Sequence, residues 1–167
     1  MPLTVKPILP RFGAEVSGVD LTRPFDPAMR REIVDTMNRW GVCVYRDTGL
    51  DDESHIAFSR IFGHLELAPA MKDRPRRHRY PELFDASNLT RDGEIVRDEN
   101  LLLHKKGDRL WHTDSSFMEM RSSYSLLLAY EWLADKGLIR KVAAPLHLTR
   151  RSMVTVDEAA YYYDGEQ

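Results

Sequence analysis

The sequence predicts an α+β protein built as one domain over residues 1–167. Short segments rich in β-branched and aromatic residues alternate with two capped, amphipathic helical segments, and apolar runs typical of strands recur later in the chain. In addition, 43% of the 167 residues are hydrophobic, which is enough for one core.

The first elements are expected to be two strands and a helix. Residues 3–19 alternate loosely between apolar and polar positions, which predicts two short strands joined by a turn. Asp26 and Pro27 are typical of a helix start, and Gly41 is typical of a helix end. The apolar residues between them recur at helical spacing and predict one buried face: Met29, Ile33, Val34, Met37 and Trp40.

A central strand and a second helix are expected next. Residues 41–47 lack a helical period and are rich in β-branched residues, so they predict a strand in which Cys43 is buried. The acidic residues 51–53 favour a helix start, and Gly63 favours its end. Further along, residues 68–81 predict a loop, residues 83–88 a strand that ends at Asn88, and residues 124–133 a buried strand.

Charge and cysteine content limit the partners to be expected. The formal charge of −2 gives no general attraction to nucleic acid or to anionic lipid, and no apolar run is long enough to span a bilayer. The prolines near the amino terminus argue against a signal peptide, and the single cysteine suits a reducing compartment. We expect a soluble cytoplasmic protein with a small-molecule substrate, without a nucleic-acid or membrane partner.

One short motif suggests metal chemistry. The segment LWHTDSSF, residues 110–117, places His112 two positions before Asp114. In an extended strand these two side chains lie on the same side, where an imidazole and a carboxylate can bind one metal ion. With a further imidazole they would form the facial triad of non-haem Fe(II) oxygenases, although a surface ion pair or a capped turn uses the same residues.

Several blocks around this motif resemble the TauD/TfdA family of Fe(II)- and 2-oxoglutarate-dependent dioxygenases, closest to its 2,4-dichlorophenoxyacetate dioxygenase-like branch. The blocks are FGAEVSGVDL, WGVCVYRD, HIAFSRIFGHLE, SNLTRDGEI and GDRLWHTDSSF, and they occur in the family's order. The resemblance implies a partial jelly roll, or double-stranded β-helix, with flanking helices in the amino-terminal half.

The same resemblance implies roles for individual residues. His112 and Asp114 would be iron ligands, and Arg151, in the strand-like segment HLTRRSMVTVD, would bind the distal carboxylate of 2-oxoglutarate. Asn88 and Lys106 would contact the substrate. The simpler alternatives are a turn residue at Asn88 and a solvated lysine at Lys106.

The chain departs from the family pattern after about residue 130, where we expect the domain to be incomplete. The family's Gly-Gly-Asp-Thr type turn is missing, and Lys136 occupies the position of the distal histidine ligand. A lysine ammonium would repel Fe(II). His147 is the only histidine downstream of the motif, so it is a weak candidate for the third ligand, and a structural histidine is the preferred interpretation.

Two main hypotheses remain open. The first is an Fe(II)/2-oxoglutarate-dependent dioxygenase that hydroxylates a small carboxylate- or sulfonate-bearing compound and releases succinate and CO2. The second is a truncated, inactive family member that acts as a metal-binding or interaction protein. A third, less favoured hypothesis keeps the barrel and changes the metal, which gives a zinc- or manganese-binding module. A homo-oligomer in which a partner chain supplies the missing strands or ligand is also consistent with the sequence.

Overall fold

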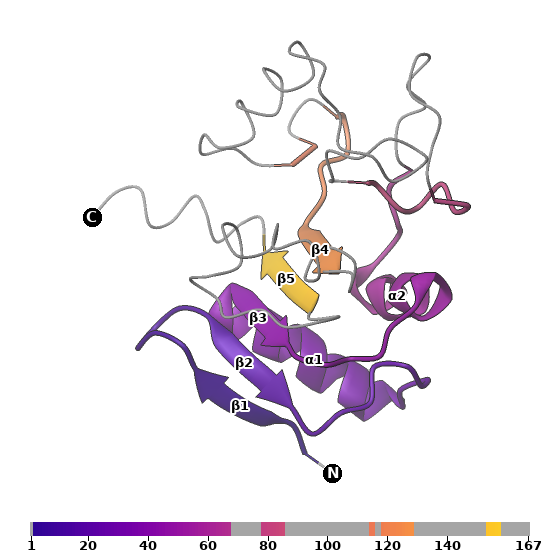
Figure 1. The fold of residues 1–167 in the computed structure, drawn as a ribbon. Helices are drawn as coiled ribbons and strands as arrows, with labels where there is room; N and C mark the ends of the chain where they lie inside the picture. Colours follow the sequence, from indigo (N-terminus) through magenta and orange to yellow (C-terminus); the bar gives the residue numbers. More distant parts are fainter. Residues whose placement is uncertain (1, 68–77, 86–113, 116–117, 129–152, 158–167) are drawn as a thin grey trace, which may run out of the picture.

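A computed structural model of the chain describes residues 2–67, 78–85, 114–115, 118–128 and 153–157, the last segment as backbone only. The described elements are five strands, two α-helices and one 3-10 helix (Figure 1). In chain order they are β1 (Thr4–Pro7), β2 (Ala14–Ser17), α1 (Pro27–Trp40), β3 (Val42–Tyr45), α2 (Asp52–Ser59), η1 (Arg60–Phe62), β4 (Tyr124–Leu128) and β5 (Met153–Asp157).

The strands form one mixed sheet in the order β1-β2-β3-β5-β4. Strands β2 and β3 are parallel and are connected by α1, whereas the other neighbouring pairs are antiparallel. Strand β5 lies between β3 and β4, with Val42 opposite Val156 and Leu128 opposite Met153. This arrangement confirms the expected α+β class for the described part of the chain, and β3 occupies the predicted central position.

Helix α1 begins and ends where its capping residues predict. The carboxylate of Asp26 accepts a hydrogen bond from the amide of Met29 at 2.8 Å, and Pro27 occupies the first helical turn, where an amide would lack an intrahelical partner. At the other end, Gly41 has φ = 70°, a conformation that favours glycine, and its amide donates to the Met37 carbonyl. Of the predicted apolar face, Ile33 and Met37 are fully buried.

Helix α2 also has the predicted start. The Asp51 carboxylate accepts the Ser54 amide, and the Ser54 hydroxyl accepts the Asp51 amide, so each satisfies a backbone donor of the other. The helix tightens into η1 before Gly63, which has φ = 143°.

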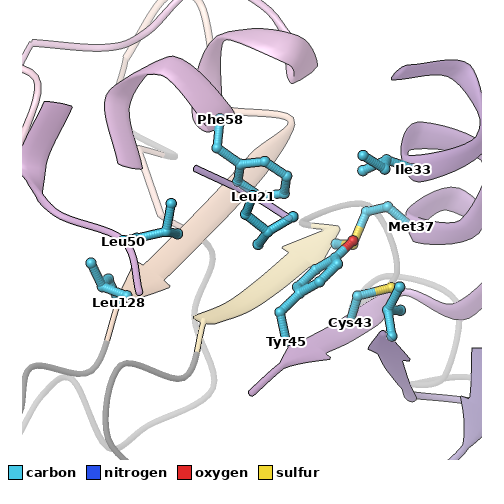
Figure 2. Close-up of a cluster of buried hydrophobic side chains, with 9 residues drawn as sticks. Leu21, Ile33, Met37, Cys43, Tyr45, Leu50, Phe58 and Leu128 are labelled. Atoms are coloured by element: carbon cyan, nitrogen blue, oxygen red, sulfur yellow. The ribbon is translucent and has the colours of Figure 1, made fainter. Parts of the chain in front are cut away.

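The core lies between the sheet and the helices (Figure 2). Phe58 from α2 is 1% exposed and makes edge-on ring contacts with Phe25, Tyr45 and Phe62, with ring centroids 5.6–6.1 Å apart. Cys43 is completely buried, as predicted. The other members of the cluster are Val16, Leu21, Ile33, Met37, Leu50 and Leu128.

Two sequence predictions need correction. Residues 83–85 do not form the beginning of a strand. The chain turns just before them, at residues 81–82, and the Leu83 amide donates to the Tyr80 carbonyl. Residues 86–88 lie outside the described part. The strand expected at 124–133 is present over Tyr124–Leu128 as β4, and residues 129–133 lie outside the described part. β4 is not buried along its length: Leu128 is in the core, whereas Leu127 is 52% exposed.

His55 is the one histidine of the described residues that is buried. Its Nδ1 atom has no hydrogen-bond partner, and burial lowers the pKa of its imidazole to about 4. The neighbouring His78 lowers this pKa further, while the Asp52 carboxylate raises it in part. The folded state therefore favours the neutral imidazole at position 55.

Replacing Phe58 by Ala is expected to lower the free energy of unfolding by about 3 to 5 kcal/mol, because it leaves a cavity where three aromatic rings now meet. Urea unfolding followed by circular dichroism measures the change. Phe84→Ala is the matched control, because Phe84 is 62% exposed and its loss should change stability little. Equal effects of the two substitutions would contradict this description of the core.

The neutral state of His55 predicts a stability loss in acid. The folded-state pKa of about 4 lies below the ordinary value of 6.5, so the unfolded chain binds a proton first and stability falls as pH drops from 6.5 to 4. This histidine should account for about 3 kcal/mol of the loss. Urea unfolding across this range should show a shallower pH dependence for His55→Gln. His64→Gln, the same change at an exposed site, should retain the parent slope; two identical slopes would contradict the assignment.

Candidate functional site

Asp114 lies in a turn at the approach to β4. Its exposed carboxylate accepts a hydrogen bond through Oδ2 from the Ser125 hydroxyl, with 2.9 Å between the oxygens. Ser125 belongs to β4, where it is opposite Val156 of β5. The acidic residue of the His-x-Asp motif is therefore linked directly to the sheet.

The residue after Asp114 has an unusual backbone conformation. Ser115 has φ = 55°, in the left-handed region that side-chain-bearing residues seldom adopt. Its carbonyl accepts the Met118 amide at 2.9 Å, which closes the turn. Such a conformation costs on the order of 1 kcal/mol and persists only when surrounding contacts hold it.

Glu66 supplies contacts of that kind. Its Oε2 atom accepts hydrogen bonds from the hydroxyls of Ser115 and Ser122, at 2.5 and 2.6 Å. The two hydroxyl oxygens are themselves 3.2 Å apart. One carboxylate oxygen thus joins the beginning and the end of the 115–122 segment to the chain that follows η1.

The strand that carries Ser125 is fixed to the core. The Tyr124 hydroxyl donates to Oδ1 of Asn38 on α1 at 2.7 Å, and the Tyr124 ring lies 5.1 Å from that of Phe62. Leu128, at the far end of β4, packs in the core cluster. The Asp114 turn is therefore supported, through β4, by α1 and η1.

Most of the predicted site residues fall outside the described part of the chain. This holds for His112, Asn88, Lys106, Arg151 and the candidate ligand His147, so their roles stay predictions. The structure does not test whether His112 and Asp114 lie on one side of a strand. It does show that Asp114 and Ser115 lie in a turn.

The described residues alone do not complete a metal site. Among them, no three His, Cys, Asp or Glu side chains are grouped so that they could hold a metal ion. The chemistry of the one predicted ligand that is described nevertheless fits Fe(II): Asp114 offers a carboxylate, and one of its oxygens is hydrogen-bonded, as is usual for ligating carboxylates. A hollow of about 300 Å³ at the ends of β2 and β3 is lined by other residues.

Three contributors to this site were missed by the sequence analysis: Glu66, Ser122 and Ser125. Glu66 is far from the motif in the chain and the two serines follow it at no characteristic spacing, so no local pattern indicates their contacts. The only available signal was the position of Glu66 at the end of the block HIAFSRIFGHLE.

None of the helices in the described residues is long and apolar enough to cross a membrane.

Comparisons with known proteins bear on the identity of the chain. Residues 4–137 match the family model described as taurine catabolism dioxygenase TauD, TfdA family. The alpha-ketoglutarate-dependent 2,4-dichlorophenoxyacetate dioxygenase of Cupriavidus pinatubonensis is 37% identical over 131 residues, which cover 77% of this chain and 46% of that protein. The (S)-phenoxypropionate/alpha-ketoglutarate-dioxygenase of Sphingobium herbicidovorans is 30% identical over 75% of this chain and 39% of that protein.

Solved structures agree. AAD-2, crystallised with Mn(II) and N-oxalylglycine, superposes with a TM-score of 0.71 at 34% identity, covering 78% of this chain and 46% of that one. A taurine dioxygenase from Burkholderia xenovorans gives a TM-score of 0.57 at 29% identity, and the match covers 75% of this chain and 39% of that chain. The chain thus spans less than half the length of each relative named here. With a family model that matches most of its residues and relatives that share its fold, this protein belongs to the TauD/TfdA family.

Proposed function

We propose that this protein is an Fe(II)- and 2-oxoglutarate-dependent dioxygenase that hydroxylates a small carboxylate- or sulfonate-bearing organic compound. In the balanced reaction, one atom of O2 enters the substrate C–H bond as a hydroxyl group and the other enters succinate, while 2-oxoglutarate loses CO2. The observation that carries the proposal is the Asp114 carboxylate, held by Ser125 in a constrained turn two residues after His112.

The proposed roles follow the chemistry of the side chains. His112 and Asp114 would hold Fe(II), with the third ligand open and His147 as its candidate. Bound Fe(II) would supply the activation of dioxygen. The Arg151 guanidinium would pair with the distal carboxylate of 2-oxoglutarate through two parallel hydrogen bonds. Asn88 and Lys106 would orient the substrate.

The relatives support this class of reaction. Two of them are named for alpha-ketoglutarate-dependent oxidation of phenoxy acids, and a third, from Pseudomonas putida, for that of sulfate esters. AAD-2 was crystallised with Mn(II) and N-oxalylglycine. Phenoxyalkanoic acids and sulfate esters are therefore the first two substrate classes to test. The described sheet would belong to a partial jelly roll.

The second candidate is an inactive, truncated family member that binds metal or another protein. Lys136 at the expected position of the distal histidine favours it, as does the missing Gly-Gly-Asp-Thr type turn. In this alternative His112 and Asp114 would form at most a weak two-ligand site. A homo-oligomer that completes the site is a variant of the first candidate. In each case we propose one soluble, cytoplasmic domain over residues 1–167.

Anaerobic titration with Fe(II) and 2-oxoglutarate distinguishes the two candidates. An intact site should give the visible charge-transfer band of 2-oxoglutarate chelated to Fe(II). Asp114→Ala should abolish the band by removing a ligand, whereas Glu119→Ala, a loss of the same charge at an exposed position of the same segment, should leave it unchanged. If the parent protein shows no band, the inactive alternative is favoured.

A further inference from the structure

We propose that Ser125 is a positioning residue for Asp114 and that Glu66 preforms the turn in which Asp114 lies. This inference deepens the proposed function and rests on it, because it assigns Asp114 to an Fe(II) site. Ser125 would not touch the metal. It would set the direction of the carboxylate before the metal binds.

The first support is the direct hydrogen bond from Ser125 to Oδ2 of Asp114 at 2.9 Å. A carboxylate fixed at one oxygen loses most of its freedom to rotate, so the direction of its other oxygen is also set. Ser125 can impose this direction because it is part of a strand that pairs with β5 and whose neighbour Tyr124 is bonded to Asn38. The donor is thus tied to the folded core.

The second support is the arrangement around Ser115. Its left-handed backbone, with φ = 55°, is unfavourable for a residue with a side chain. The Glu66 carboxylate offsets that cost by accepting hydrogen bonds from Ser115 and Ser122, which brings the two ends of the segment together. The turn is therefore held by contacts within the protein.

When the turn is already formed, metal binding does not have to order it, so the unfavourable free energy of ordering is smaller. Loss of an outer-shell partner of a metal ligand typically weakens metal affinity about 10- to 100-fold. We expect an effect of this size when the Ser125 hydroxyl is removed. A hydroxyl that merely stabilised β4 would not change metal affinity in the folded protein.

The test measures Mn(II) affinity by electron paramagnetic resonance, with Mn(II) alone as the probe and the full chain as the sample. Ser125→Ala should bind Mn(II) about 10- to 100-fold more weakly than the parent protein. Ser125→Thr retains a hydroxyl on a side chain that suits a strand, so it should restore the affinity. Ser123→Ala, the same deletion at an exposed neighbouring position, should bind like the parent protein. Circular dichroism establishes that each variant is folded.

The outcomes separate this inference from the proposed function. If the parent protein binds Mn(II) and Ser125→Ala binds it equally well, the positioning role is wrong while the metal site stands. If the parent protein fails to bind Mn(II), both the proposed function and the positioning role are overturned. If Ser125→Ala weakens binding and Ser125→Thr fails to restore it, a hydroxyl is not the responsible group and the inference is wrong.

A measurement without metal tests the role of Glu66. Glu66→Ala should accelerate hydrogen exchange at the Met118 amide, which donates to the Ser115 carbonyl, because the turn loses both hydroxyl contacts. Asp35→Ala removes a charge of the same sign from the exposed face of α1 and should leave this exchange rate unchanged. An unaltered rate in Glu66→Ala would show that the turn does not depend on the carboxylate.

Discussion

The described structure depends on strand β5, which joins two parts of the sheet that are otherwise separate. β5 pairs with β3 on one side and with β4 on the other, and β4 has no other strand partner among the described residues. Without β5, the strand that carries Ser125 would lose this pairing and keep side-chain contacts such as those of Tyr124 with Asn38 and Phe62. The backbone pairing through β5 therefore connects β4, and with it the Asp114 turn, to the rest of the sheet.

The candidate site illustrates how a fold can orient a carboxylate side chain before any metal ion binds. Its described polar contacts are partly exposed, and each alone contributes little to stability. They act on one short segment, however, and they connect it to the chain that follows η1 and, through β4, to α1 and the sheet. Stability resides mainly in the apolar core around Phe58, whereas the serine and glutamate contacts determine the direction of a single carboxylate.

Local signals were enough to predict the elements but not their assembly. The helix boundaries depend on contacts between residues a few positions apart, so they could be predicted from the sequence. Asp26 and Asp51 accept backbone amides at the helix starts, and Gly41 ends α1. The pairing of Val42 with Val156 has no local signature, and neither do the bonds of Glu66 to Ser115 and Ser122. The strand expected from residue 83 was wrong at its start: the Leu83 amide donates to the Tyr80 carbonyl in a turn, and residues 83–85 form no strand.

The complete burial of Cys43 has a practical consequence. Buried thiols of this kind react poorly with alkylating reagents, and the sequence contains no second cysteine. A cysteine introduced at Met120, which is 83% exposed in the segment between Asp114 and β4, would therefore be the single accessible thiol of the chain. A fluorescent or spin label attached there would report on this segment alone, so its motions could be followed without background from the rest of the molecule.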